Sequence, residues 1–230
     1  MKRHNRKTGA CTGKRIIAAL CGAVVFGLAG CGGCAGTTLK EAPTALFVIG
    51  NSLTNSGPVP SLGWYGSWGM AASAAEKDYV HLVASSMHLP LTIRNFAGLE
   101  LTPALSAAGI PAIAAPVTAS TMVIIQLSDN VQPGILPEFA RQYGKLLDAV
   151  NQARVLICIS TWGKADSYDA IIEAACLKHG GRYLFIGDIR TDPASLDSQG
   201  VQFSDPGVNM HPHDWSMARI AERIVAAARQ

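Results

Sequence analysis

The sequence predicts an α/β protein, namely a three-layer α/β/α sandwich with a central, mostly parallel sheet of five strands. Short apolar runs of strand length alternate along the chain with stretches whose apolar residues recur at helical spacing. Several runs are continuously apolar, which is typical of parallel strands buried on both faces. With 230 residues, 49% of them hydrophobic, the chain is long enough for one domain with a sizeable core.

The first predicted strand covers Ala45 to Ile49 and gives way at Gly50 to a small polar cluster that contains Ser52. Gly, Asn and Ser are turn-forming residues, so we expect the strand to end there. The other four predicted strands run from Leu91 to Gly98, Met122 to Asn130, Val155 to Thr161 and Arg182 to Asp188.

Apolar residues at helical spacing predict four helices between and after these strands. They run from Met70 to Met87, from about Pro137 to Gln152, from Ser167 to His179 and from about Asp214 to Ala228. Residues 53–69 are rich in Gly, Pro and Trp and are expected to form a loop. Residues 103–118 are expected to form a loop or a short helix broken by Pro111 and Pro116.

The first 30 residues have the pattern of an export signal, because basic residues precede an apolar stretch that is too short for a membrane span. The stretch ends in Leu28-Ala29-Gly30-Cys31, which resembles the lipobox of bacterial lipoproteins. The resemblance implies a signal peptide over 1–30, lipid on Cys31, a flexible tether over 31–43 and a folded domain over 44–230. Gly32 after the lipid site favours an outer-membrane protein that faces the periplasm; an exported protein with a chance cysteine is the alternative.

The basic balance of the whole chain belongs to this signal. Six of the 19 Lys and Arg residues, and none of the 16 Asp and Glu residues, lie in the first 30 positions. The rest of the chain therefore has a net charge of −3, with 13 basic and 16 acidic residues. A nucleic-acid partner is not expected, because no basic surface would attract it.

Three cysteines follow Cys31 in the sequence: Cys34, Cys158 and Cys176. An exported compartment permits a disulfide between Cys158 and Cys176, but the spacing does not establish one, and we expect two buried thiols. No Cys/His cluster has zinc-like spacing and no Gly-rich phosphate loop occurs, so neither a metal nor another cofactor is expected.

Polar residues follow three of the predicted strands, and a histidine comes near the carboxyl terminus. Ser52 follows the first strand, Gly98 ends the second, Asn130 ends the third, and His211 precedes the last helix. Parallel strands bring their carboxyl ends to one edge of the sheet, which is where open α/β sheets place their sites. Ester hydrolysis needs a hydroxyl, a base and donors for the developing oxyanion, and each has a candidate here.

Together these segments resemble the blocks of the SGNH, or GDSL-like, hydrolase superfamily, whose fold is flavodoxin-like. The segments are "GNSLT", "NFAGLEL", "IIQLSDNV" and "MHPHDWSM". The resemblance implies that Ser52 is the nucleophile and His211 the base. It further implies that the backbone N–H groups of Ser52 and Gly98 and the side-chain amide of Asn130 form the oxyanion hole.

The sequence departs from the family pattern at two positions. Ser128 stands where the family usually has glycine, and its side chain is expected to narrow the cleft. Val208 stands where the family usually has the aspartate of the triad. Asp205, six residues before His211, could serve if the loop bends; otherwise a backbone carbonyl would orient the imidazole and leave a Ser–His dyad.

The resemblance implies a serine esterase, and the lipobox implies that it is anchored to a membrane. The envelope location and the tryptophan loop favour removal of short acyl groups, such as acetyl, from carbohydrate or related envelope esters. The expected partners are a small-molecule or glycan ester and, through the lipid, a membrane. A non-catalytic glycan-binding lipoprotein, a lysophospholipase or thioesterase, and an acyltransferase remain alternatives. His213 is the rival of His211 as base, and Trp64 and Trp68 would either stack on a sugar ring or pack in the domain.

Overall fold

A computed structural model describes residues 41–197 and 203–230. The predicted signal peptide, the lipid site Cys31, Cys34 and most of the predicted tether lie outside these residues. The chain divides into two units, and every element described below belongs to the unit Lys40–Gln230. Within the described ranges, no helix is long and apolar enough to cross a membrane.

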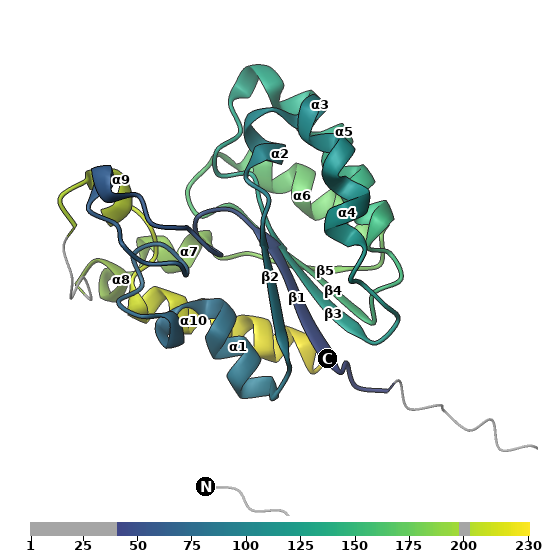
Figure 1. Cartoon of the computed structure of the whole chain (residues 1–230), viewed down its shortest axis with the longest axis horizontal. Helices are drawn as coiled ribbons and strands as arrows, with labels where there is room; N and C mark the ends of the chain where they lie inside the picture. The colour runs from purple at the N-terminus through teal and green to yellow at the C-terminus, as the bar shows by residue number, and fades with distance from the viewer. Residues whose placement is uncertain (1–40, 198–202) are drawn as a thin grey trace, which may run out of the picture. The chain divides into compact units, whose positions relative to one another are not determined.

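The centre of this unit is a five-stranded sheet of order β2-β1-β3-β4-β5, in which every neighbouring pair is parallel. The strands are β1 (Ala45–Gly50), β2 (Leu91–Asn95), β3 (Thr121–Gln126), β4 (Val155–Ile159) and β5 (Arg182–Leu184). Helices cover both faces (Figure 1). The predicted fold class is therefore confirmed.

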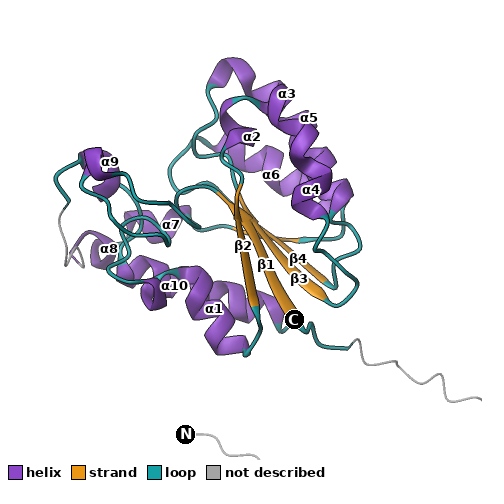
Figure 2. Ribbon diagram, viewed as in Figure 1, coloured by secondary structure: helices purple, strands orange, loops and turns teal. Residues whose placement is uncertain are grey.

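The helices form two layers, which Figure 2 shows on opposite sides of the sheet. One layer contains α2 (Gly98–Leu101), α3 (Pro103–Ser106), α4 (Ile110–Ala114), α5 (Leu136–Ala149) and α6 (Asp166–Lys178). The other contains α1 (Tyr79–Met87), α7 (Gly187–Thr191), α8 (Pro193–Asp197) and α10 (Asp214–Ala228). The short helix α9 (Pro206–Asn209) precedes α10, and 3-10 turns occupy Pro60–Leu62, Ala75–Lys77, Ala107–Gly109 and Pro133–Ile135.

Successive residues of the central strands point to opposite faces, so the sheet has a hydrophobic core on each side. Phe47 and Ile49 of β1 pack with Phe139 and Tyr143 of α5. The alternate β1 residues pack on the other face with α1 and α10. Burial of both faces explains why β1 and β3 are continuously apolar.

The predicted helix from Met70 to Met87 is too long at its start, because α1 begins only at Tyr79. The Asp78 carboxylate accepts a hydrogen bond from the His81 N–H at 2.8 Å and caps the helix there. Its other oxygen accepts from the Gly69 N–H at 3.0 Å and ties the preceding loop to this cap. Ala71 in that loop has a φ of 73°, which a right-handed helix does not allow.

Strand β5 is also shorter than predicted, since the chain leaves the sheet after Leu184. The Ile186 N–H donates to Ser160 Oγ instead of to a strand, and α7 begins at Gly187.

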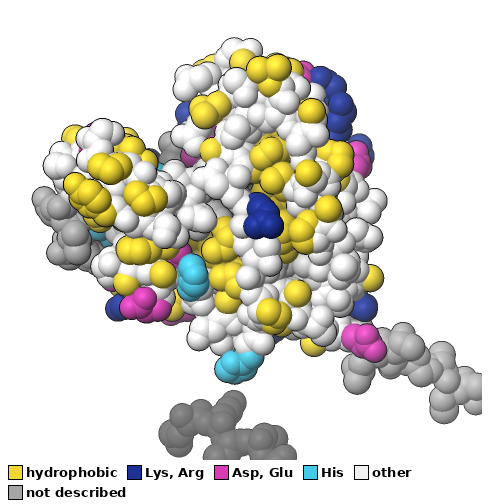
Figure 3. All heavy atoms as spheres, in the orientation of Figure 1, with side chains coloured by type: hydrophobic (Ala, Val, Ile, Leu, Met, Phe, Trp, Pro, Cys, Tyr) yellow, Lys and Arg dark blue, Asp and Glu magenta, His cyan; other side chains and the backbone are white. Residues whose placement is uncertain are grey.

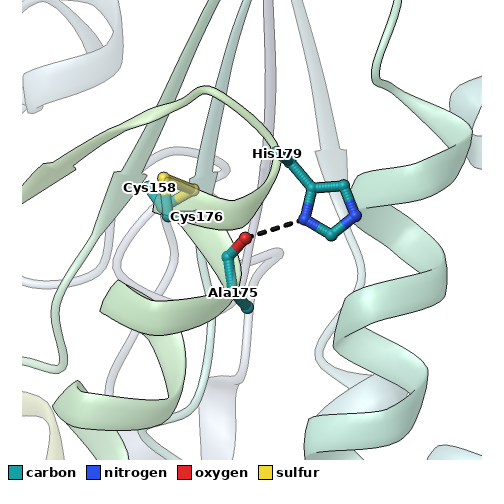
Figure 4. The surroundings of a disulfide bond; sticks show 4 residues. All are labelled: Cys158, Ala175, Cys176 and His179. Atoms are coloured by element: carbon teal, nitrogen blue, oxygen red, sulfur yellow. Dashed lines mark hydrogen bonds between the residues drawn. A yellow bond between two sulfur atoms is a disulfide. The ribbon is translucent and has the colours of Figure 1, made fainter.

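The expectation of two buried thiols is wrong, because Cys158 and Cys176 form a disulfide between β4 and α6 (Figure 4). Helix α6 packs directly on β4, which brings the two Cα atoms to 6.0 Å, within the range that a disulfide spans. Figure 4 also shows His179 after the end of α6, where its Nδ1 lies 2.7 Å from the carbonyl oxygen of Ala175.

Candidate active site

Ser52 lies in a tight turn directly after β1, at the carboxyl end of the sheet. Gly50 permits this turn, because a Cβ there would lie 1.9 Å from Thr54 Oγ1 and 2.9 Å from the Gln126 carbonyl oxygen. The Asn51 side chain stabilises the turn by accepting a hydrogen bond from the Leu53 N–H at 3.0 Å. The sequence around the strand end thus presents the Ser52 hydroxyl at the sheet edge.

His211 follows α9 and meets Ser52 from the other end of the chain. Its Nε2 lies 2.8 Å from Ser52 Oγ, and its Nδ1 lies 2.8 Å from the carbonyl oxygen of Gly207. A carbonyl oxygen only accepts hydrogen bonds, so the neutral imidazole carries its proton on Nδ1. Nε2 therefore has a lone pair to accept the Ser52 hydroxyl proton.

Asp205 forms no hydrogen bond or ion pair with His211 in the described part of the chain. Its carboxylate caps α9 and accepts hydrogen bonds from the N–H groups of Gly207, at 2.7 Å, and Val208, at 3.3 Å. Val208 is 1% exposed and packs beside Trp64. Of the two arrangements that the sequence left open, the structure has the one in which a backbone carbonyl orients the imidazole.

Burial lowers the pKa of His211, because desolvation disfavours the charged imidazolium. The Gly207 carbonyl and the nearby Asp129 carboxylate oppose this shift, and His213 adds to it. The net effect keeps His211 neutral, and thus able to accept a proton, at neutral pH.

Among the described residues, His213 forms no hydrogen bond with Ser52. It is 5% exposed, its Nε2 lies 3.3 Å from the Asn209 carbonyl oxygen, and its ring lies 6.3 Å from that of Phe203.

Three groups that follow β1, β2 and β3 are candidate hydrogen-bond donors to an oxyanion. In the described part of the chain, the N–H groups of Ser52 and Gly98 donate to no protein acceptor. Gly98 begins α2, and the Phe96 N–H holds this segment to the end of β1 through a 2.7 Å bond to the Gly50 carbonyl. Asn130 uses one amide N–H to donate to Glu100 at 2.7 Å, which leaves its second N–H available.

Glu100 is one of the residues of this region that the sequence analysis did not single out. It is 0% exposed, and its carboxyl group accepts hydrogen bonds from the side-chain amides of Asn51 and Asn130 and from the Ser128 N–H. Burial raises its pKa, while these donors oppose the rise. Glu100 thus links the segments that follow β1, β2 and β3; its position two residues after Gly98 in the second block was the available signal.

The expectation that Ser128 narrows the cleft is wrong, because its side chain is 0% exposed and does not line the cavity. Its φ is 116°, a conformation that favours glycine. This backbone conformation accounts for the glycine usual at the matching position of the family. It also directs the Ser128 N–H to Glu100.

The cavity beside Ser52 has a volume of about 190 Å³. It is lined by Ser52, Leu53, Asp129, Asn130, Trp162, Gly163, Lys164, Arg190, Gly207, Met210 and His211. Asp129 links the segments that follow β1, β3 and β4. One of its oxygens accepts hydrogen bonds from Gln126 Nε2 and Asn51 Nδ2, and the other accepts one from the Trp162 N–H.

Trp64 and Trp68 pack in the domain and do not line this cavity. Trp64 is 2% exposed, and its ring lies edge-on to those of Trp68 and Phe203, at 5.6 Å from each. The tryptophan of the cavity is Trp162, whose Nε1 donates to the Met210 carbonyl at 2.8 Å. Across residues 41–197 and 203–230, no group of three or more His, Cys, Asp and Glu side chains is arranged to hold a metal ion.

No protein-family model and no curated protein matches the chain. Solved structures do match it. Protein YxiM from Bacillus subtilis has a TM-score of 0.53 and 13% identity over 82% of this chain, which spans only 56% of the YxiM chain. A carbohydrate esterase, whose active site is described as having divergent catalytic and non-catalytic binding functions, has a TM-score of 0.52 and 12% identity, covering 84% of this chain and 70% of its own.

A lipolytic protein of the G-D-S-L family from Desulfitobacterium hafniense has a TM-score of 0.52 and 12% identity, covering 80% of this chain and 99% of its own. The chain shares the fold of these proteins. At this low identity the likeness concerns the fold, so the roles of individual residues must rest on their geometry.

The four residues implied by the resemblance lie after β1 (Ser52), at the start of α2 (Gly98), after β3 (Asn130) and before α10 (His211). Ser52 and His211 are in hydrogen-bonding contact. Asn130 lines the same cavity, whereas Gly98 lies at the start of α2 and does not line it. Glu100, Asp129, Trp162 and the Gly207 carbonyl complete the site, and only the carbonyl had been considered as an alternative from the sequence.

Proposed function

We propose that this chain is a serine ester hydrolase that removes short acyl groups, such as acetyl, from carbohydrate or related envelope esters. The observation that carries the proposal is the 2.8 Å contact between Ser52 Oγ and His211 Nε2, which are 159 residues apart in the sequence. The neutral state of His211 and the donors near Ser52 support the same chemistry.

In the proposed reaction, Ser52 Oγ attacks the carbonyl carbon of the ester while its proton passes to His211 Nε2. The N–H groups of Ser52, Gly98 and Asn130 stabilise the tetrahedral oxyanion. The bond to the alcohol then breaks, and the leaving oxygen takes the proton from Nε2. A water molecule, deprotonated by the same nitrogen, attacks the acyl-serine, releases the acid and restores Ser52.

The cavity supports a short acyl group. About 190 Å³ is small beside the roughly 300–1,000 Å³ of ordinary ligand pockets, and Leu53, Trp162 and Met210 supply its apolar surface. A series of p-nitrophenyl esters from acetate to octanoate tests this part, because a lysophospholipase or thioesterase would prefer the longer chains. Product analysis with an acceptor sugar tests acyl transfer.

The deciding experiment is the Ser52→Ala variant. Turnover of p-nitrophenyl acetate and labelling by a fluorophosphonate should both disappear, whereas Ser67→Ala, an exposed serine, should behave as the wild type. Normal turnover by Ser52→Ala would refute the proposal.

The second candidate is a glycan-binding protein without catalysis. It is favoured by the absence of a carboxylate on His211 Nδ1, whose partner is the Gly207 carbonyl. The carbohydrate esterase with the same fold, described as having catalytic and non-catalytic binding functions, gives it a parallel. This candidate would be favoured if the wild-type protein binds sugar and is not labelled by fluorophosphonates.

The proposal includes the location. Lipid on Cys31 would anchor the domain to the outer membrane, facing the periplasm. Metabolic labelling with palmitate tests the anchor: label should enter the wild type and not Cys31→Ala.

A further inference from the structure

Two cationic side chains, Lys164 and Arg190, line the cavity that contains Ser52 and His211. Lys164 lies in the loop after β4, and Arg190 lies on α7. Both also line an adjoining cavity of about 190 Å³. Arg190 and His211 line a third, of about 160 Å³. Arg190 therefore lies where these cavities meet, on the side of the imidazole.

Arg190 forms no ion pair or hydrogen bond with the described residues. Asp188, on the same helix, is occupied by Arg223, which binds both of its oxygens at 2.6 Å. Lys164 likewise has no ion-pair partner in that part of the chain, and its Nζ lies 5.5 Å from the ring centre of Tyr168. The donors of both cations are thus free to bind a ligand.

Gly163 leaves the space in which the guanidinium lies. A Cβ at Gly163 would be 2.5 Å from Arg190 Nη1 and 2.9 Å from its Cζ. A side chain at this position would therefore require the guanidinium to shift. Gly163 thus leaves free the space that the Arg190 guanidinium occupies.

The nearby carboxylates form no direct ion pairs with Lys164 and Arg190 in the described ranges. Asp129 lines the same cavity, but both of its oxygens accept hydrogen bonds from N–H groups. Asp166 and Asp169 line the adjoining cavity, where Asp169 accepts from the Thr161 N–H at 2.8 Å. Neither Asp166 nor Asp169 forms an ion pair with Lys164 or Arg190 in the described ranges.

We propose that the substrate carries an anionic group, a carboxylate, phosphate or sulfate, on the alcohol part of the ester, and that Arg190 and Lys164 bind it. This inference rests on the proposed function, because the proposed reaction defines where the two parts of the ester lie. His211 gives its proton to the leaving alcohol, so the alcohol part lies on the imidazole side, where Arg190 is. The planar guanidinium matches the paired oxygens of such groups.

The test compares kcat/KM for O-acetyl glucose, O-acetyl glucuronate and O-acetyl glucose 6-phosphate. We expect a charged ester to be preferred on the order of tenfold, since hydrogen bonds to charged groups are stronger than neutral ones. The preference should shrink in high salt. The better of the two charged esters shows whether the site prefers a carboxylate or a phosphate.

The double variant Arg190→Gln, Lys164→Gln should bring the ratio of charged to neutral kcat/KM close to one. Arg94→Gln, which removes an exposed arginine from β2, is the matched control and should keep the wild-type ratio. Equal kcat/KM for all three esters, or a preference that survives in the double variant, would overturn the inference and leave the esterase standing.

If none of the esters is turned over, the proposed function fails, and calorimetric titration of the wild type with glucuronate, glucose 6-phosphate and glucose decides the anion site. Binding of a charged sugar that the double variant loses supports the site. Equal or absent binding of the three sugars overturns it.

Discussion

The base of the candidate site, His211, and its oxyanion donor, Asn130, are held in place in different ways. The imidazole of His211 is oriented by one backbone carbonyl, from a helix of four residues. The amide of Asn130 is held by Glu100, a carboxyl group that is 0% exposed and accepts three N–H groups. The network of buried hydrogen bonds thus lies on the oxyanion side.

This difference indicates what the base and the oxyanion donor each require. An oxyanion donor stabilises charge only if it is aimed in advance, so a buried network that fixes Asn130 serves that purpose. A base needs the correct tautomer, and the Gly207 carbonyl selects it. The carbonyl supplies no negative charge to stabilise the imidazolium, so we expect a slower esterase than one with a triad carboxylate.

The largest effect is expected on the base side, from His211→Gln. Loss of the base should lower kcat/KM about 10²–10⁴-fold, whereas His213→Gln should lower it far less. In the wild type, the lowered pKa of His211 means that the base form persists below pH 6.5, so kcat/KM should fall only at lower pH. An acid limb centred above pH 6.5, or equal losses in the two variants, would contradict the assignment.

The next largest effect is expected on the oxyanion side, from Asn130→Ala. Removal of one oxyanion donor typically lowers kcat about 10²–10³-fold, with little change in KM. Asn151→Ala, at an exposed position after α5, is the control. A change confined to KM would mean that the amide binds the substrate and does not stabilise the oxyanion.

A smaller effect is expected from Glu100→Gln, which keeps the shape of the side chain and removes one of its acceptor oxygens. The Asn130 amide should be held less firmly in its orientation, and kcat should fall about tenfold. The loss of a buried hydrogen bond should also lower the free energy of unfolding by about 1–3 kcal/mol. Glu138→Gln, in an exposed pair with Arg141, is the control. Lower stability with unchanged kcat would show that Glu100 supports only the fold.

The smallest effect is expected from Asp205→Asn, because asparagine caps a helix about as well as aspartate. The rate should change by less than about threefold, whereas the same change in a triad aspartate lowers kcat about 10⁴-fold. A large loss would show that Asp205 replaces the Gly207 carbonyl during the reaction.

The sequence by itself determined the sheet and the order of the site segments. Continuous apolar runs marked β1 and β3, because burial on both faces leaves no polar positions in such strands. Helical spacing placed α10 at Asp214–Ala228, with the bounds that the structure shows. The end of the strand before Ser52 and the start of the helix after His211 were local patterns, whereas the roles of the two residues were implied by the resemblance to the SGNH superfamily.

Only the tertiary structure decided the partners that come from distant segments. Glu100 lies two residues after Gly98, but its neighbours in the sequence do not show that it is buried, and its role depends on Asn51, Ser128 and Asn130 converging on it. The Gly207 carbonyl and the Cys158–Cys176 disulfide are likewise fixed by how helices pack against neighbouring segments. A backbone carbonyl has no signature in the sequence, since every residue has one, and only folding selects which of them meets the imidazole.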